Sequence, residues 1–172
     1  LFLLFVLISC HKEIKAEKGG IDLISNVYFD ASKGLNKMQT FHVSKINYQN
    51  DSIIELVPDL EFPEMMTATY FIKDSVFYDL NNNTSVVLSE LQKKQKPTSV
   101  YAKTMGAVFT KEPLLNYKNR RKLSDTILFK KKYKRFEINS PWNYTRYYIY
   151  PTDTILPYSL YKEVGNDYHG RI

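Results

Sequence analysis

The three histidines are the first side chains to consider for catalysis in this 172-residue sequence. His11, His42 and His169 are far apart, and none belongs to an H-x-x-E-H or H-E-x-x-H zinc pattern. The sequence also contains neither a G-x-S-x-G nucleophile turn nor a G-x-x-x-x-G-K-[ST] phosphate loop. An ordinary strand residue satisfied by a hydrogen bond or by water explains His42 and His169 better than catalysis does.

Carboxylates provide the other possible catalytic set. Five of them are close in the sequence: Asp51, Glu55, Asp59, Glu61 and Glu64. A glycosidase uses two such groups as acid and base, but a solvated strand and loop explain this cluster adequately. We therefore predict that the protein is not an enzyme and that it holds neither a cofactor nor a metal ion.

The only cysteine, Cys10, follows nine residues without a charge, LFLLFVLIS. At about 1.5 Å per residue, this run is too short to cross a hydrocarbon core of roughly 30 Å. A short apolar run that ends in a small residue is typical of a secretory signal peptide. With Leu7 three positions before it, Cys10 resembles the lipobox cysteine of bacterial lipoproteins, whose thiol receives a diacylglycerol.

The lipobox resemblance implies a signal peptide over residues 1–9 that lacks its own start, and an acylated, palmitate-type anchor on Cys10. Residues 10–20, whose tail HKEIKAEKGG is polar, then act as a tether. The alternatives are a buried N-terminal strand with Cys10 in the core, or an ordinary signal peptide beside an incidental cysteine. We expect an exported protein of the bacterial cell envelope, on the outer membrane rather than the inner, whose membrane partner is reached through Cys10.

A basic cluster lies in the segment KKKYKR. Its cations are Lys130, Lys131, Lys132, Lys134 and Arg135. Interleaved rings such as Tyr133 would suit single-stranded nucleic acid, but export excludes nucleic acid as a partner. The same surface could face anionic lipid headgroups, and a solvent-facing strand whose lysines protect a sheet edge is the preferred interpretation.

Aromatic residues are dense in the segment WNYTRYYIY. Tyr144, Tyr148 and Tyr150 fall on one side of a predicted strand, with Arg146 between them. Such rings could line a groove for sugars or acyl chains. Packing on a core would give the same pattern and is the more common cause.

Composition predicts a mainly β fold with one or two helices. The chain has 14 Tyr and 10 Phe, and its 6 Gly and 7 Pro fall mostly between apolar runs. The formal net charge is +6, which is moderately basic. At this length we expect one β-rich domain over residues 21–172.

The best helix candidate is residues 21–32, because Ile21, Ile24, Val27 and Tyr28 recur near the helical period. After it, residues 37–48 and 51–57 are expected to pair as a hairpin around a Gln49-Asn50 turn.

An antiparallel meander is predicted next. Its strands are residues 67–72, 76–80 and 85–88, and the segments between them are rich in turn-forming residues. Residues 90–96 are expected to form a polar loop or helical turn, and residues 114–123 an irregular connection.

The C-terminal part is predicted as a series of long hairpins. Residues 125–138 form one long strand, residues 142–150 the next, and residues 155–164 a third. A Gly165-Asn166-Asp167 turn leads to residues 168–172, which are either cut short or a short edge strand.

Two segments, TYFIKDSVFYDLNNNTSVVL and YYIYPTDTILPYSLYKEV, resemble strand–turn–strand units of the periplasmic lipoprotein-carrier superfamily, the LolA and LolB type. The resemblance covers about a third of the chain and implies a curved antiparallel half-barrel whose concave side holds an apolar ligand. It carries no individual binding residue over to this chain.

Two functions follow as hypotheses. The first is an envelope lipoprotein that binds an apolar or amphiphilic ligand, or a partner lipoprotein, in the concave face of a half-barrel. The second is a non-enzymatic interaction subunit of an envelope or surface complex, without a ligand cavity. A filled concavity would favour the second, whereas an open apolar concavity would favour the first. A hydrolase of envelope carbohydrate is a third possibility, which rests only on the carboxylates and tyrosines.

Overall fold

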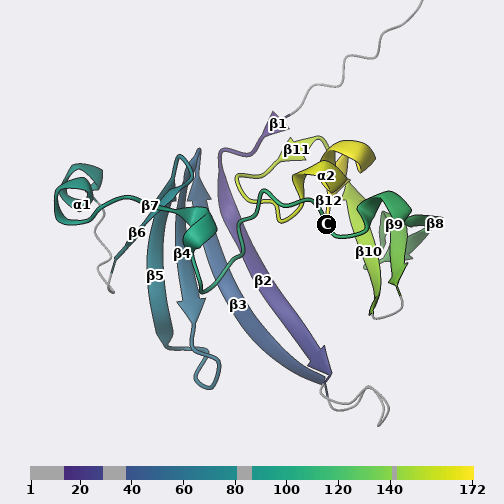
Figure 1. Cartoon of the computed structure of the whole chain (residues 1–172), viewed down its shortest axis with the longest axis horizontal. Helices are drawn as coiled ribbons and strands as arrows, with labels where there is room; N and C mark the ends of the chain where they lie inside the picture. The colour runs from purple at the N-terminus through teal and green to yellow at the C-terminus, as the bar shows by residue number, and fades with distance from the viewer. Residues whose placement is uncertain (1–13, 29–37, 81–86, 141–142) are drawn as a thin grey trace, which may run out of the picture. The chain divides into compact units, whose positions relative to one another are not determined.

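A computed structural model describes residues 14–28, 38–80, 87–140 and 143–172 (Figure 1). Its internal contacts gather in two compact units, an N-terminal unit of residues 16–112 and a C-terminal unit of residues 113–172 that also includes Ile14 and Lys15. Each unit contains its own sheet. The sequence predicts one domain over residues 21–172 and gives no signal for two units. Cys10 and the signal peptide predicted for residues 1–9 lie outside the described residues.

The N-terminal unit is a six-stranded antiparallel meander in the order β2-β3-β4-β5-β6-β7 (Figure 1). Its strands are β2 (Lys18–Tyr28), β3 (Met38–Gln49), β4 (Ser52–Pro58), β5 (Met66–Lys73), β6 (Val76–Asp79) and β7 (Thr98–Ser99). Asn50, with a φ of 53°, and the pair Asp74 and Ser75, with φ of 51° and 63°, make the tight turns. Asn and Asp tolerate this left-handed conformation better than most residues.

Both faces of this sheet are covered around β4 and β5. On one face, Phe71, Tyr78 and Leu80 form a buried cluster, against which Leu88 and Leu91 of helix α1 (Leu88–Lys94) pack. On the other face, the segment that follows β7 begins with a short 3-10 helix, Val100–Ala102, whose Val100 is buried, and it continues to the buried Ala107. The middle of the sheet therefore forms the core of this unit.

The C-terminal unit contains a four-stranded antiparallel sheet in the order β12-β10-β9-β8 (Figure 1). Its strands are β8 (Arg121–Leu128), β9 (Lys131–Ser140), β10 (Asn143–Pro151) and β12 (Gly170–Arg171). Helix α2 (Lys162–Tyr168) contributes Val164 and Tyr168, one turn apart, to the core on one face of this sheet. The stacked rings of Phe136 and Tyr147, with centroids 4.7 Å apart, belong to the same face.

Three short elements complete the C-terminal unit. Strand β1 (Ile14–Lys15) pairs in parallel with β11 (Thr154–Ile155). A 3-10 helix, Tyr117–Asn119, precedes β8 and is attached to α2, because Tyr117 and Arg120 both donate hydrogen bonds to Asp167. Among the described residues, no helix is long and apolar enough to span a bilayer.

The mainly β class with two helices is confirmed, and so are most strands of the N-terminal unit. The β3–β4 hairpin lies where the sequence places it, and β5 and β6 form the first part of the predicted meander. The third run, 85–88, falls mostly outside the described residues, but Leu88 already begins α1. The helical turn expected within residues 90–96 is confirmed as part of α1.

The helix predicted for residues 21–32 is wrong, because residues 18–28 form strand β2. The register shift between Leu23 and Ile24 adds one residue, Val43, on the β3 side, and β2 itself keeps the alternation of a strand: residues 21, 23 and 25 are half-buried, and residues 22, 24 and 26 are exposed. Ile21 and Ile24 are β-branched, and β-branched side chains favour a strand once β3 is available as a partner.

Two further predictions in the C-terminal unit are wrong. Residues 125–138 are not one strand, because a two-residue turn at Phe129 and Lys130 divides them between β8 and β9. Residues 155–164 extend only as β11, and the predicted turn at Gly165-Asn166-Asp167 lies inside α2. Packing of Val164 and Tyr168 on the core outweighs the weak helix propensity of those three residues. The short edge strand at the end is present as β12.

Candidate binding face

The outer face of the C-terminal sheet, opposite α2, carries tyrosines and cations. Cross-strand partners point to the same side of a sheet, and two sets of partners define this face. Glu137 of β9 lies between Arg121 of β8 and Arg146 of β10, and Tyr150 of β10 lies opposite Arg171 of β12. We call this surface the tyrosine–arginine face. Its members are Arg121, Lys131, Tyr133, Arg135, Glu137, Tyr144, Arg146, Tyr148, Tyr150 and Arg171.

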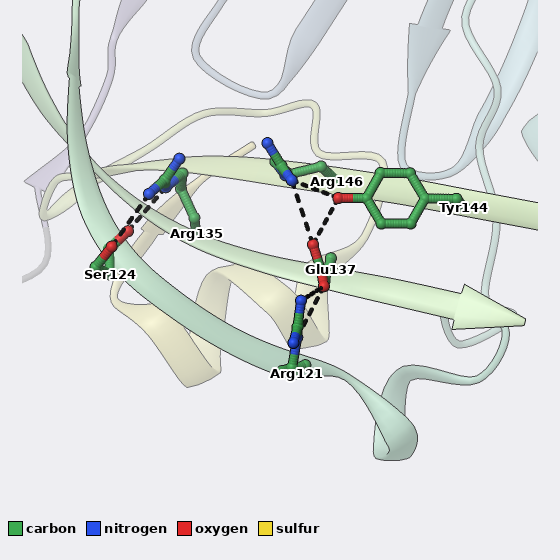
Figure 2. A network of polar contacts seen from close by, with 6 residues as sticks. All are labelled: Arg121, Ser124, Arg135, Glu137, Tyr144 and Arg146. Carbon is green, nitrogen blue, oxygen red and sulfur yellow. Dashed lines mark hydrogen bonds and ion pairs between the residues drawn. The ribbon is translucent and has the colours of Figure 1, made fainter.

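Glu137 is the centre of a polar network on this face (Figure 2). Arg121 donates to Oε1 of Glu137 through Nε, at 2.8 Å, and through Nη2. The hydroxyl of Tyr144 donates to Oε2 at 2.6 Å, and Nη2 of Arg146 donates to the same oxygen at 3.4 Å. Two guanidinium groups and a phenol thus share one carboxylate, which leaves the network with one net positive charge.

The network leaves its cations on the outside and its anion inside. The side chain of Glu137 is 4% exposed, whereas that of Arg121 is 75% exposed and that of Arg146 is 39% exposed. A guanidinium carries five N–H donors in a planar fork. Because Glu137 engages the Nε and Nη2 edge of Arg121, the Nη1 donors of that exposed side chain point away from the carboxylate.

Hydrogen bonds set the protonation of this network. The hydrogen bond from Tyr144 lowers the pKa of the Glu137 carboxyl below its usual value, and the hydrogen bond and charge of Arg121 act in the same direction. Hydrogen bonding to Tyr148 and Tyr144 raises the pKa of Arg146. At neutral pH the face is therefore fixed as one carboxylate and two guanidinium cations.

Arg135 holds the irregular part of β8. The pairing of β8 with β9 shifts register between Leu123 and Thr126, and Ser124 lies within that shift. Arg135 donates from Nε to the carbonyl of Ser124 at 2.8 Å, and from Nη2 to its hydroxyl at 3.2 Å (Figure 2). Both of these hydrogen bonds go to Ser124, so Arg135 stabilises the strand pairing.

Cations and rings alternate at the β12 end of the face. Tyr150 is flanked by the ammonium of Lys131, 5.1 Å from its ring centroid, and by the guanidinium of Arg171, 5.7 Å from the same centroid. The ring of Tyr133 lies 5.7 Å from that of Tyr150. These cation–π contacts order long basic side chains while their charges stay near solvent.

The predicted tyrosines share one side of β10, as the spacing indicates. Tyr144, Tyr148 and Tyr150 alternate with Tyr147 and Ile149, whose side chains face the core. Tyr144 is exposed, and its hydroxyl donates a hydrogen bond to Glu137. The three tyrosines therefore belong to an open sheet face rather than to the core.

The predicted basic cluster is divided by the alternation of β9. Lys131 and Arg135 join the tyrosine–arginine face, and Lys130 lies in the β8–β9 turn. Lys132 and Lys134 point to the other side: Lys132 forms an ion pair with Asp125 at 3.1 Å, and Lys134 donates to the last carbonyl of α2 at 2.6 Å. The five cations are close in the sequence, but their side chains lie on different sides of the hairpin and have different partners.

Sequence reasoning missed Glu137, Arg121 and Arg171 as members of the face. Period-two spacing from Tyr133 places Glu137 on the right side of β9 and could have found it. Arg121 and Arg171 are brought to the face by strand pairing, which needs the register of β8 and the position of β12.

The N-terminal unit contains a second polar cluster, which is buried. Glu55 of β4 accepts a hydrogen bond from the hydroxyl of Ser44 at 2.8 Å and one from the backbone N–H of Ala107 at 2.5 Å. Lys103 binds its other oxygen at 2.7 Å and also donates to the carbonyl of Met105 at 2.7 Å. The side chains of Glu55 and Lys103 are 0% and 1% exposed, so this ion pair attaches the 103–107 segment to the sheet.

The backbone of this segment needs glycine at one position. Gly106 has a φ of +73°, and a Cβ there would press on the Glu55 carboxylate and lie 2.7 Å from Cγ2 of Val57. Burial lowers the pKa of the Lys103 ammonium, and the hydrogen bond and charge of Glu55 oppose that shift. Removing one partner of such a buried pair leaves the other charge uncompensated, so the Glu55–Lys103 pair has a structural role as a clamp on this segment.

Two of the five candidate carboxylates have structural partners. Glu55 is engaged by Lys103, and Asp59 accepts the backbone N–H groups of Glu61 and Phe62, which lower the pKa of its carboxyl. In the part of the chain that the structure describes, no three His, Cys, Asp or Glu side chains gather closely enough to hold a metal ion.

Comparisons with known proteins add no relative. No family model matches the chain, and neither the curated proteins nor the solved structures yield a match. The resemblance to the lipoprotein-carrier superfamily therefore stays a prediction.

Proposed function

We propose that the protein is a non-enzymatic interaction subunit of the bacterial cell envelope, anchored through an acylated Cys10, and that its tyrosine–arginine face binds an acidic surface of a partner protein. The observation that carries this proposal is the Glu137 network, in which a buried carboxylate holds two exposed guanidinium groups in place. Arginine forks bind carboxylates in a bidentate manner, and their cost of ordering is smaller when the side chain is already held.

The composition of the face fits a protein partner. Tyrosine and arginine are enriched where proteins bind one another, because a rigid ring or a planar fork buries much surface for little loss of rotamer freedom. Tyr148 and Tyr150 supply such rings beside Arg146 and Arg171. The cations of the face outnumber its single carboxylate, so an acidic partner is complementary.

The packing of the N-terminal unit favours an interaction subunit over a carrier of apolar ligands. A carrier needs an open apolar concavity, but the middle strands of the six-stranded sheet are covered on both sides. Phe71 and Tyr78 pack toward α1, whereas Glu55 and Tyr70 face the segment that contains Lys103. Side chains and segments of the unit itself therefore occupy both faces at the middle of this sheet, which favours a sheet without a ligand cavity.

A labelled decapeptide of glutamate is a direct probe of the proposed surface. The Arg121→Gln/Arg171→Gln variant removes two positive charges from the face, and Lys93→Gln/Lys94→Gln removes two from α1 in the other unit. Fluorescence anisotropy at physiological salt should show a loss of affinity of at least about tenfold for the arginine variant, since each charged contact contributes about 1 kcal/mol.

The lysine variant is the matched control, because its net charge changes equally. It should keep the affinity of the unmodified protein. Equal losses in both variants would mean that the peptide responds only to overall charge, and the proposed surface would then be wrong.

A further inference from the structure

The tip of the β8–β9 hairpin exposes two large apolar side chains. Phe129 is 90% exposed, the highest fraction among the described large apolar residues, and Ile127 on the same hairpin is 74% exposed. Single apolar residues on a surface need no explanation, but two on one tip form a local apolar surface.

The conformation of the turn makes Phe129 a costly choice. Phe129 and Lys130 both have positive φ, 51° and 62°, between the paired residues Leu128 and Lys131. A two-residue turn of this kind favours Asn-Gly or Asp-Gly, because a bulky side chain in the left-handed region is strained. Neither folding nor solubility therefore accounts for a phenylalanine here, and such local conflicts concentrate at functional positions.

Lysines surround this apolar tip. Lys130 is in the turn itself, and Lys131 and Lys132 open β9 directly after it. Lys131 lies over the Tyr150 ring and Lys132 pairs with Asp125, so the three lysines and this carboxylate leave the tip with two net positive charges. Lysines beside an exposed aromatic ring suit the interface of an anionic bilayer, where the ring enters the boundary of headgroups and acyl chains and the ammonium groups meet lipid phosphates.

The N-terminal unit offers an internal comparison. The connection between β4 and β5 exposes Leu60, Phe62 and Met65, with Phe62 at 55%. Its charged neighbours are acidic, namely Asp59, Glu61 and Glu64. An anionic bilayer attracts the first tip and repels the second, although both expose apolar surface.

We propose that the β8–β9 hairpin tip, residues 127–132, docks into the interface of an anionic lipid bilayer, with Phe129 as the inserted side chain. This surface shares Lys131 with the tyrosine–arginine face, but it includes no residue of the Glu137 network, and the proposal does not depend on the partner proposed for that face. It gives the C-terminal unit a lipid contact of its own, in addition to the anchor predicted at Cys10.

Tryptophan at the tip reports insertion directly. The sequence has a single tryptophan, Trp142, so a Trp142→Phe background allows one new probe at a time in the full chain. Phe129→Trp is compared with Phe62→Trp, the matched apolar tip with acidic neighbours. The vesicles contain brominated phosphatidylcholine, either alone or with an equal part of phosphatidylglycerol, and emission wavelength and quenching are recorded.

With the anionic vesicles, the probe at position 129 should shift to shorter wavelength and be quenched, and the probe at position 62 should do neither. Adding Lys130→Gln should lower the ratio of docked to free hairpin about fivefold, the effect of one cation near an anionic surface. Circular dichroism confirms that each variant is folded. An unquenched probe at position 129, or equal quenching at both positions, would overturn the proposal.

Discussion

Glu55→Gln removes the anion of the buried ion pair and leaves its cation in place. Lys103 is 1% exposed and would keep Met105 as a carbonyl acceptor, but it would lose the counter-charge that Glu55 supplies. Breaking a buried pair by removing one partner costs about 3–5 kcal/mol, because the remaining charge is uncompensated. Against a total stability of about 5–15 kcal/mol for a typical domain, this is a large fraction.

The loss should depend on pH in a defined direction. Burial lowers the pKa of Lys103, and in the variant the opposing contribution of Glu55 is absent, so the pKa should fall further. Between that lowered pKa and the usual value of about 10.4 for lysine, the unfolded chain binds more protons than the folded chain. Stability of the variant therefore rises with pH through this window, and the gap to the unmodified protein narrows.

Equilibrium urea unfolding at about pH 7 and about pH 10 measures this gap, with a linear dependence of free energy on denaturant. Hydrogen exchange of amides in residues 16–112 locates the loss in the N-terminal unit. Glu61→Gln, the same chemical change at an exposed position, should stay within about 0.5 kcal/mol of the unmodified protein. If Glu55→Gln costs no more than this control, Glu55 does not act as the clamp described here.

Three further changes test other parts of the structure. Gly106→Ala should destabilise the N-terminal unit by more than about 1 kcal/mol in urea unfolding, because the positive φ and the nearby Glu55 carboxylate both oppose a Cβ. Phe129→Asn should raise the free energy of unfolding by about 0.5 kcal/mol, because Asn accepts the left-handed turn, and the thermal midpoint should rise slightly with it. A lower midpoint would contradict the strain assigned to Phe129. Glu137 has a lowered pKa, so the stability it provides is present above about pH 4.5 and is lost as pH falls through that lowered pKa. Glu137→Gln should flatten this acid limb in a pH titration of unfolding, and an unchanged limb would assign the acid loss to other groups.

Strands with regular alternation and turn-forming residues at their ends could be predicted from the sequence. The β3–β4 and β5–β6 hairpins have both signals, so their positions match closely. The β8–β9 hairpin has the alternation but not the turn residues, because Phe129 and Lys130 occupy positions that usually hold Asn or Gly. Helix α2 could not be predicted, because Gly165-Asn166-Asp167 is typical of a turn. The helix is stabilised by packing of its apolar side chains on the core, which is a tertiary effect.

The candidate binding face could be predicted in part. The spacing of Tyr144, Tyr148 and Tyr150 places them on one side of a strand, and that side is the open one. The Glu137 network could not be predicted, because Arg121 reaches Glu137 through a β8 pairing whose register shifts between Leu123 and Thr126. A sequence pattern indicates which residues share a strand face, but not which residue lies opposite.

Site-specific photo-crosslinking in cells of the native host type tests the central proposal most directly. Benzoylphenylalanine replaces Tyr148 on the tyrosine–arginine face, or Tyr101, an exposed tyrosine of the N-terminal unit, as the control. We expect one discrete adduct from position 148, with an acidic envelope protein identified by mass spectrometry, that is lost when Arg121→Gln is added and absent from position 101. No adduct at position 148, or the same adducts at both positions, would contradict the proposal that this face binds a partner.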